Sequence, residues 1–150
     1  MARFRFRLEA SLRLAEQVLD KARRKMAEEM RKQQEIADLV ERRRRRWELA
    51  VAGQREAGLH RPQELGGWQA YTVRQLGLLR ASEAELAAQT ARVEKARSAV
   101  VLAHQETEKF QRLKEKLLIL FQRAEMKKEQ AAIDEVGQVI YWHQRHDWVN

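Results

Sequence analysis

The chain has 150 residues, of which 35% are charged and only 7% are aromatic, and it carries a net charge of +8. Six glycines and one proline offer few turns, which argues against a β-sandwich, a β-barrel or a repeated βαβ fold. The absence of cysteine excludes a disulfide, a thiolate nucleophile and a Cys-ligated zinc site, and it fits a cytoplasmic protein. We therefore expect an elongated all-α protein.

No apolar run approaches the roughly 18 residues that indicate a membrane span. The first residues also lack the apolar stretch and the small-residue cleavage site of a secretory signal. We expect no transmembrane segment.

From Leu8 onward, one stripe of side chains recurs at alternating steps of four and three residues. Steps that average 3.5 keep the stripe facing a partner helix along a left-handed supercoil, so the spacing predicts a coiled-coil helix over about residues 4–52. Polar residues interrupt the stripe, and the sequence leaves open whether Glu29 and Gln33 are paired or mark a flexible joint. The stripe consists of Leu8, Leu12, Ala15, Leu19, Ala22, Met26, Glu29, Gln33, Ile36, Val40, Arg43, Trp47 and Ala50.

The positive charge is concentrated in the first part of the chain. Residues 1–62 hold 17 Lys and Arg against 10 Asp and Glu, whereas residues 63–150 hold 13 against 12. Five of these cations form one uninterrupted run, Arg42, Arg43, Arg44, Arg45 and Arg46. Such a run suggests a patch for an acidic partner, and a solvated helix face is the alternative.

Residues 53–67 contain four of the six glycines and the only proline, Pro62. Glycine costs about 1 kcal/mol in a helix interior and proline about 3 kcal/mol, so the sequence predicts a connector here.

The stripe returns after the connector and predicts a second helix over about residues 68–138, with a tail at 139–150. A connector of this length lets the second helix fold back on the first. We therefore predict a single coiled-coil domain, 1–150, built as a long antiparallel two-helix hairpin that is monomeric when free; a parallel dimer is the alternative. The second stripe consists of Leu79, Ser82, Leu86, Gln89, Val93, Ala96, Val100, Ala103, Thr107, Phe110, Lys114, Leu117, Phe121 and Ala124.

No pattern for catalysis or cofactor binding is present. Gly53 and Gly58 have P-loop spacing, but the Lys and Ser/Thr that must follow are missing. His143, His146 and Asp147 have a spacing that could bind a metal, but they lie near a chain end without further ligands. We expect no enzyme activity, no cofactor and no metal site.

Two groups of aromatic residues remain. The first group flanks the connector and consists of Trp47, Trp68 and Tyr71. The hairpin would bring these side chains together at its tip. There they cover the end of the coiled coil, form a docking patch, or both. The second group is Val139-Ile140-Tyr141-Trp142 with Trp148, which lies in the overhang beyond the reach of the first helix. The second helix alone would outreach the first by about 20 residues. Apolar side chains there indicate either a binding segment or a packing contact that the sequence does not reveal.

The opening Phe4-Arg-Phe-Arg-Leu8-Glu-Ala-Ser-Leu12 resembles the Phe-x-Phe-Arg-Leu-x-x-x-Leu start of the flagellar export protein FliJ family. Trp68-Gln-Ala-Tyr71 is similar to the Trp-x-x-Tyr that opens the second helix in some members. The resemblance covers essentially the whole chain. It implies an antiparallel coiled coil in the flagellar type III export apparatus, acting as a non-enzymatic stalk and adaptor at the cytoplasmic face of the membrane at the flagellar base.

The resemblance also implies partners and their sites. The open end of the hairpin, which includes both termini, would bind the ring of the export ATPase FliI and promote assembly of that ring. The tip would bind the cytoplasmic domain of the export gate protein FlhA. Export chaperones would bind as well. Arg74 and Glu85 replace an aromatic residue and a histidine of the family's gate-binding surface. The implied tip residues are Trp47, Trp68, Tyr71, Leu78 and Ala81. The implied open-end residues are Phe4, Phe6, Leu8, Leu12, Tyr141 and Trp142.

Three alternatives stay open. A stalk protein of a virulence type III secretion system has similar coils, although the N-terminal motif favours the flagellar branch. A nucleic-acid-binding coiled coil would fit the pI of 10.2, but no reading motif is visible, so no specific nucleic acid is expected. The third alternative is a scaffold coiled coil without an export role.

Overall fold

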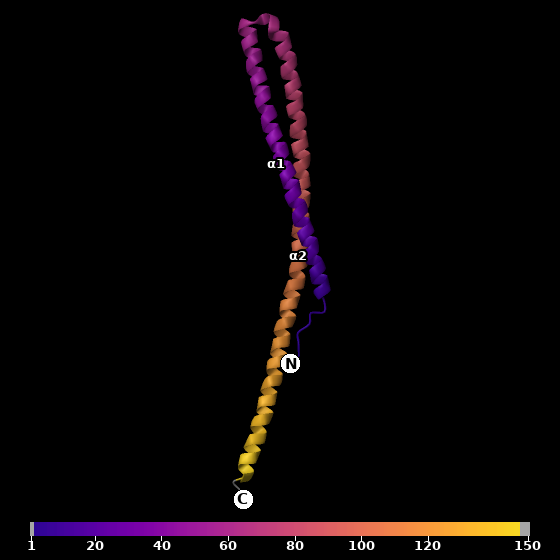
Figure 1. Ribbon diagram of the computed structural model, residues 1–150, viewed down its shortest axis with the longest axis vertical. Coiled ribbons are helices and arrows are strands. Elements are labelled where there is room, and N and C mark those ends of the chain that lie inside the picture. Colours follow the sequence, from indigo (N-terminus) through magenta and orange to yellow (C-terminus); the bar gives the residue numbers. More distant parts are fainter. Residues whose placement is uncertain (1, 148–150) are drawn as a thin grey trace. The chain divides into compact units, whose positions relative to one another are not determined.

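The computed structural model describes residues 2–147 and contains two long helices. Helix α1 spans Glu9–His60, a short 3-10 helix η1 spans Pro62–Glu64, and helix α2 spans Leu65–Asp147 (Figure 1). No strand occurs within residues 2–147. The prediction of an all-α protein built from two packed helices is confirmed.

The contacts divide the chain into two compact units. The hairpin unit comprises residues 17–104, and the terminal unit combines residues 2–16 with residues 105–147. Each contains a part of α1 and a part of α2. The single domain 1–150 stays a prediction.

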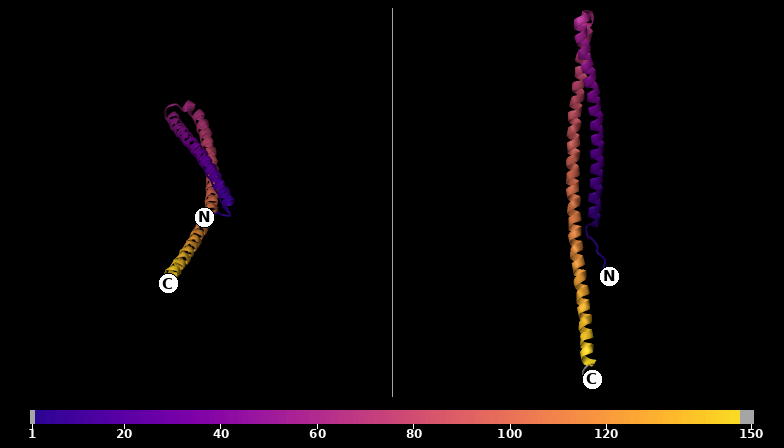
Figure 2. Two further views of the ribbon diagram at one scale, coloured as in Figure 1. Left: turned by 60° about the horizontal axis from the view of Figure 1, so that its bottom comes forward. Right: turned by 90° about the vertical axis from the view of Figure 1, so that its left-hand side faces the viewer.

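In the hairpin unit, α1 and α2 run side by side in opposite directions (Figures 1 and 2). Every stripe residue of α1 in this unit is buried or half-buried, as the heptad spacing predicts. Half of the buried apolar side chains are alanines, so the core gains little from apolar burial, which contributes about 25 cal/mol per Å². The buried apolar side chains of this unit are Leu19, Val40, Ala50, Ala57, Leu79, Val93, Ala96 and Ala103.

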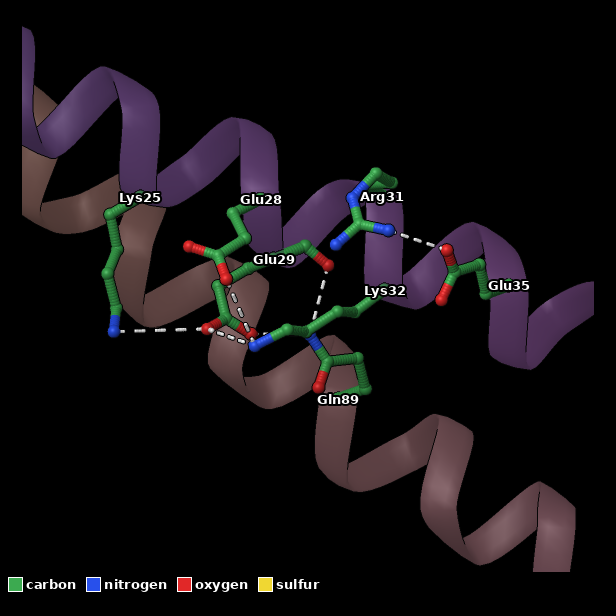
Figure 3. A network of polar contacts seen from close by, with 7 residues as sticks. All are labelled: Lys25, Glu28, Glu29, Arg31, Lys32, Glu35 and Gln89. Atoms are coloured by element: carbon green, nitrogen blue, oxygen red, sulfur yellow. Dashed lines mark hydrogen bonds and ion pairs between the residues drawn. The ribbon is translucent and has the colours of Figure 1, made fainter.

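The polar interruption at Glu29 is filled by an interhelical pair (Figure 3). The side-chain amide of Gln89 on α2 donates to the backbone carbonyl of Glu29 at 2.9 Å and to its carboxylate at 2.5 Å. Both side chains are buried. One helical turn away, the amide of Gln33 donates to the hydroxyl of Thr90 at 3.1 Å. The interruptions at Glu29 and Gln33 are therefore paired across the helices.

Electrostatics keep the buried Glu29 carboxylate ionised. Hydrogen bonding by Gln89 is the main cause that lowers the pKa of Glu29, and the nearby cations Lys32, Lys25 and Arg92 add to it, while burial acts in the opposite direction. The amines of Lys25 and Lys32 lie 4.0 Å and 3.9 Å from the same carboxylate oxygen (Figure 3).

The interruption at Arg43 is also filled from the opposite helix. Its guanidinium donates to the backbone carbonyl of Leu78 at 3.0 Å and to the hydroxyl of Ser82. The Ser82 hydroxyl donates in turn to the Leu78 carbonyl at 3.1 Å. A buried serine in place of a larger residue leaves room for the guanidinium, so Arg43 lies within the helix interface.

The chain turns between the helices over far fewer residues than the predicted connector 53–67. Helix α1 continues to His60 and α2 begins at Leu65, three residues before the predicted start at Trp68. None of the glycines in residues 2–147 has a positive φ, so those in the predicted connector fit helical backbone. Pro62 disfavours the α conformation at the preceding Arg61, whose φ of −138° and ψ of 64° end the helix. The proline terminates α1, whereas the glycines only weaken the helix locally.

Gly53 has a packing role. A Cβ atom there would lie 2.5 Å from Cη2 and 2.8 Å from Cε3 of Trp68. The missing side chain lets the indole ring pack directly against α1, which closes this end of the hairpin unit.

In the terminal unit, the first residues are not helical, so the predicted start at residue 4 is wrong. Phe6 is buried, and its backbone carbonyl accepts the N–H of Glu9 at 3.2 Å, which precedes the first turn of α1. The ring of Phe4 lies 5.6 Å from that of Phe121, and the amine of Lys114 lies 3.0 Å from the carboxylate of Glu9. Packing of Phe4 and Phe6 against the terminal unit holds the segment before α1 in a non-helical conformation.

The stripe of α2 changes phase in the terminal unit. Leu117 and Ala124 are exposed, and their neighbours Leu118 and Glu125 are half-buried in their place. An α-helix has 3.6 residues per turn, so a heptad stripe of period 3.5 drifts around the helix unless supercoiling compensates. The predicted core positions Leu117 and Ala124 are therefore wrong by one residue, whereas Phe121 is half-buried as predicted.

Helix α2 continues to Asp147, past the predicted end near residue 138 and through most of the predicted tail; residues 148–150, with Trp148, lie outside the described part. No proline stops the helix, and Gln130 donates to Asp134 four residues later at 3.0 Å. Arg145 and His146 in the last turn are well placed for the helix dipole. Every residue over 126–147 is exposed.

We expect Glu29→Gln to lower the melting temperature near pH 7, because the amide keeps one acceptor but loses the ionic attraction of Lys25 and Lys32. Because the pKa of Glu29 is lower in the folded state than in the unfolded chain, ionised Glu29 stabilises the fold at pH values above the ordinary carboxyl pKa. This stabilisation is lost as the pH falls through the pKa of the folded state. The difference from the parent should therefore shrink below about pH 5 in thermal melts followed by circular dichroism. Glu28→Gln, at an exposed neighbouring position, is the control with a small effect. A difference for Glu29→Gln that is constant from pH 7 to pH 3 would contradict this assignment.

Gly77→Ala should raise the melting temperature by about 2–4 °C, since alanine is better in a helix by about 1 kcal/mol and nothing lies within 4 Å of the new Cβ.

Gly53→Ala should lower the melting temperature, because the new Cβ displaces the Trp68 ring. Overpacking costs about 1–3 kcal/mol, which exceeds the stabilisation from the higher helix propensity of alanine. In a Trp68→Ala background, Gly53→Ala should become stabilising. If both glycine variants stabilise the parent chain equally, Trp68 does not pack on Gly53.

Candidate partner-binding surfaces

The tip of the hairpin unit presents an aromatic pair on the first turns of α2. Trp68 and Tyr71 are three residues apart, which places them on one face of the helix, and their rings meet edge to face at a centroid distance of 6.0 Å and an angle of 81°. Trp68 is half-buried against Gly53, whereas Tyr71 is 40% exposed. The pair therefore closes the end of the hairpin and leaves an aromatic edge in solvent.

A shallow hollow adjoins this pair. It is lined by Trp68, Tyr71, Gly67 and the η1 residues Gln63 and Glu64. Tyrosine and tryptophan supply a large contact area with little loss of side-chain entropy, which favours such surfaces in protein recognition.

The other predicted tip residues lie on both helices of the hairpin unit. Trp47 is half-buried in the stripe of α1. Leu78 is 41% exposed and Ala81 is exposed. Leu78 lies seven residues after Tyr71, two turns along the same helix, so both side chains stand on one face of α2, with Arg74 and Gln75 between them. Arg43 binds the Leu78 carbonyl and fixes that turn from α1.

The five-arginine run does not form one patch. Helical geometry distributes consecutive residues around the axis, and Arg43 points into the interface. Arg44 lies 3.6 Å from Glu83 on α2 and 3.5 Å from Glu41, and Arg45 lies 3.5 Å from Glu41. Among the described residues, no ion pair involves Arg42 or Arg46, which share a face four residues apart. Arg44 and Arg45 share the carboxylate of Glu41, so the run still carries excess positive charge on the surface.

The predicted open-end residues fall into two classes. Phe6 and Leu12 are buried in the core of the terminal unit, and Phe4 and Leu8 are half-buried. By contrast, Tyr141 is 60% exposed and Trp142 is 64% exposed. Only the second class offers side chains that are free to meet a partner without rearrangement.

The exposed segment 126–147 of α2 carries further apolar side chains. A single apolar residue on a surface is ordinary, but a helix with many along more than five turns lacks a covering element among the described residues. These exposed side chains are Met126, Ile133, Val136, Val139, Ile140, Tyr141 and Trp142.

Neither a metal site nor a membrane span is found in the described part of the chain. No group of three His, Cys, Asp or Glu side chains within residues 2–147 could hold a metal ion. The spacing of His143, His146 and Asp147 therefore does not produce a metal site in this range. The ring of His146 instead lies 5.6 Å from that of Trp142. No helix in this range is long and apolar enough to cross a membrane.

One candidate surface was missed by the sequence analysis. Lys21 and Lys25 on α1 and Arg92 and Lys95 on α2 line a common hollow in the hairpin unit. All four residues are next to stripe positions in the sequence, and this is the only sequence feature that points to the hollow. Their proximity depends on the register of the two helices, and heptad spacing alone does not supply it.

A family model described as the flagellar FliJ protein matches residues 4–146. The match includes both helices, the non-helical Phe4 to Phe6 segment and the exposed end of α2. Neither the comparison with curated proteins nor the comparison with solved structures finds a significant match. Because the family model covers nearly the entire chain, this protein belongs to the flagellar FliJ family, a component of the flagellar export apparatus.

Proposed function

We propose that this chain is a non-enzymatic stalk and adaptor that binds the FliI ring through the terminal unit and the FlhA cytoplasmic domain through the tip, and so promotes ring assembly and export. The observation that carries the proposal is the family match over residues 4–146, together with exposed aromatic side chains in each of the two units. ATP hydrolysis belongs to the partner.

The gate contact is assigned to Tyr71, Leu78 and Ala81 on α2, with Trp68 and Trp47 as support. Tyr71 and Leu78 combine exposure with a fixed backbone, because Trp68 packs on Gly53 and Arg43 holds the Leu78 carbonyl. Residues that are preorganised lose little entropy on binding, which favours them as binding hot spots.

The ring contact is assigned to Tyr141 and Trp142 on α2. Phe4, Phe6, Leu8 and Leu12 contribute indirectly, since they build the core of the terminal unit. A ring with a central opening would cover the apolar side chains of an inserted helix, so the exposed segment 126–147 suits such a partner.

Coupling between the two partners requires that the rod bind different states of ring and gate with different affinity. Binding one partner then shifts the conformations that the other populates. In this account the protein works at the cytoplasmic face of the membrane at the flagellar base, and export chaperones join it there.

The test is a reciprocal loss of function with FliI and the FlhA cytoplasmic domain from the same organism. Tyr71→Ala with Leu78→Ala should weaken gate binding by at least about 10-fold in calorimetry, since hot-spot truncations cost 2 kcal/mol or more. This variant should still stimulate FliI turnover and ring assembly. Tyr141→Ala with Trp142→Ala should abolish the stimulation and keep the gate affinity.

Two exposed apolar positions on α2 supply matched controls. Val73→Ala and Ile119→Ala truncate exposed apolar side chains outside the assigned contacts and should leave both activities unchanged. Circular dichroism checks that every variant stays helical. If gate binding survives the tip variant, the tip assignment is wrong, and if the parent chain neither stimulates nor co-elutes with FliI, the ring assignment is wrong.

A further inference from the structure

A hollow on the hairpin unit is bordered by cations from both helices. Lys21 and Lys25 come from α1, and Arg92 and Lys95 come from α2. The pairs face each other across the helix interface because α1 and α2 are antiparallel and the Glu29–Gln89 pair holds their register. The hollow has a volume of about 580 Å³.

Between these cations the hollow is lined by three alanines, Ala22, Ala96 and Ala99, and at one side by Glu29. The methyl groups of the alanines leave the space that larger residues would fill. Val18 and Leu102 are exposed one turn from Lys21 and Ala99, so the apolar surface extends beyond the hollow on both helices. Small residues allow a third helix to approach closely, at an axial distance of about 8–10 Å.

The cations around the hollow share a single carboxylate, that of Glu29, which also lines the hollow. The Lys25 amine lies 4.0 Å from it and Arg92 interacts with it electrostatically, while it also accepts from Gln89 and lies 3.9 Å from Lys32. Within the described residues, no ion pair involves Lys21, Arg92 or Lys95, and all three are exposed. Elsewhere on α1, by contrast, Arg31 pairs with Glu35 at 2.7 Å. The hollow therefore presents an excess of positive charge around an apolar centre.

We propose that this hollow is a docking site for an acidic amphipathic helix of a partner protein, which places small or apolar side chains on Ala22, Ala96 and Ala99 and Asp or Glu side chains against Lys21, Arg92 and Lys95. Charge complementarity at the border supplies steering and orientation, and the apolar centre supplies the burial that holds the helix.

The chemistry of the hollow favours a peptide over a nucleic acid. Single-stranded nucleic acids need aromatic faces on which bases stack, and no aromatic side chain lines the hollow. A phosphate backbone would contact the cations but leave the alanines without a partner. A protein helix with acidic and apolar faces uses both features.

The site is distinct from the tip and from residues 126–147, so the inference does not rest on the proposed contacts with the gate or the ring. Variants at the hollow should keep FliI stimulation and FlhA binding. Failure of the docking test leaves those two assignments untouched, and failure of those assignments leaves this one untouched.

The test uses the full chain and a fluorescein-labelled peptide of three heptads, with Leu and Ala on one face and Glu on the other positions. Fluorescence anisotropy should show saturable binding that weakens as salt is raised, since screening reduces the charge term. The same peptide with Lys in place of every Glu should not bind. Lys21→Gln with Lys95→Gln should weaken binding of the acidic peptide by about 10-fold, the loss expected for two charged contacts.

Arg55→Gln with Arg80→Gln is the matched control, because it removes one exposed cation from each helix of the hairpin unit, outside the hollow and at positions without an ion pair among the described residues. Its affinity should stay within about 2-fold of the parent, the effect of distant screened charges. Ala99→Glu should also weaken binding, by placing a carboxylate in the centre. An equal loss in both double variants, or no binding of the acidic peptide at a concentration of about 0.1 mM, would overturn the proposal. So would tighter binding of a labelled 20-nucleotide DNA that depends on the same lysines.

Discussion

The buried pair of Glu29 and Gln89 is the constraint on which the hairpin unit depends. A core of alanine and few large side chains distinguishes poorly between alternative alignments of two helices, because sliding one helix by a heptad exchanges similar apolar groups. Glu29 differs from its neighbours, since its carboxylate and its backbone carbonyl both accept from one amide. A shifted alignment would leave this carboxylate buried without a donor, which is strongly unfavourable. Gln33 with Thr90 and Arg43 with Ser82 add to the same restriction.

This alignment determines which surfaces the two units offer. It places Trp68 over Gly53, so that Tyr71 and Leu78 stand exposed on a backbone held by α1. It also brings the cations of α1 and α2 around one hollow. In the terminal unit, Phe4 packs on Phe121 and Glu9 on Lys114, while α2 continues with exposed Tyr141 and Trp142. The two units therefore expose separate aromatic, apolar and basic surfaces, which we propose as partner sites.

Much of the fold was predictable because heptad spacing identifies the buried face of a helix even where the residue is polar. Ser82 and Thr107 are buried at their predicted positions. Helix boundaries were less predictable, since four glycines within residues 53–67 suggest a loop, whereas only Pro62 ends the helix. The N-terminal segment departs from the helical pattern because Phe6 gains more by packing in the core than by continuing α1. The change of phase at Leu118 also depends on three-dimensional packing.

For the candidate sites, the hairpin predicted that Trp47, Trp68 and Tyr71 lie together at the tip. The rings of Trp68 and Tyr71 do meet, but among the described residues no ring contact joins Trp47 to them. The five arginines were harder to interpret, because a run in the sequence becomes a ring around a helix. The partner of each arginine depends on the opposite helix and therefore on the alignment. The basic hollow was beyond sequence reasoning for the same reason.

The most direct test of the account is a disulfide crosslink between α1 and α2 of one chain, at positions that the observed alignment brings together. Such a test is feasible because the sequence contains no cysteine. Gln33→Cys with Thr90→Cys should form an intrachain disulfide under mild oxidation, seen as a monomer by non-reducing electrophoresis and mass spectrometry. Gln33→Cys with Ser98→Cys, about 12 Å further along α2, should not. The single variant Gln33→Cys should stay monomeric. Covalent dimers of the single variant, or an absent crosslink in the Gln33 and Thr90 pair, would contradict the hairpin and favour a parallel dimer.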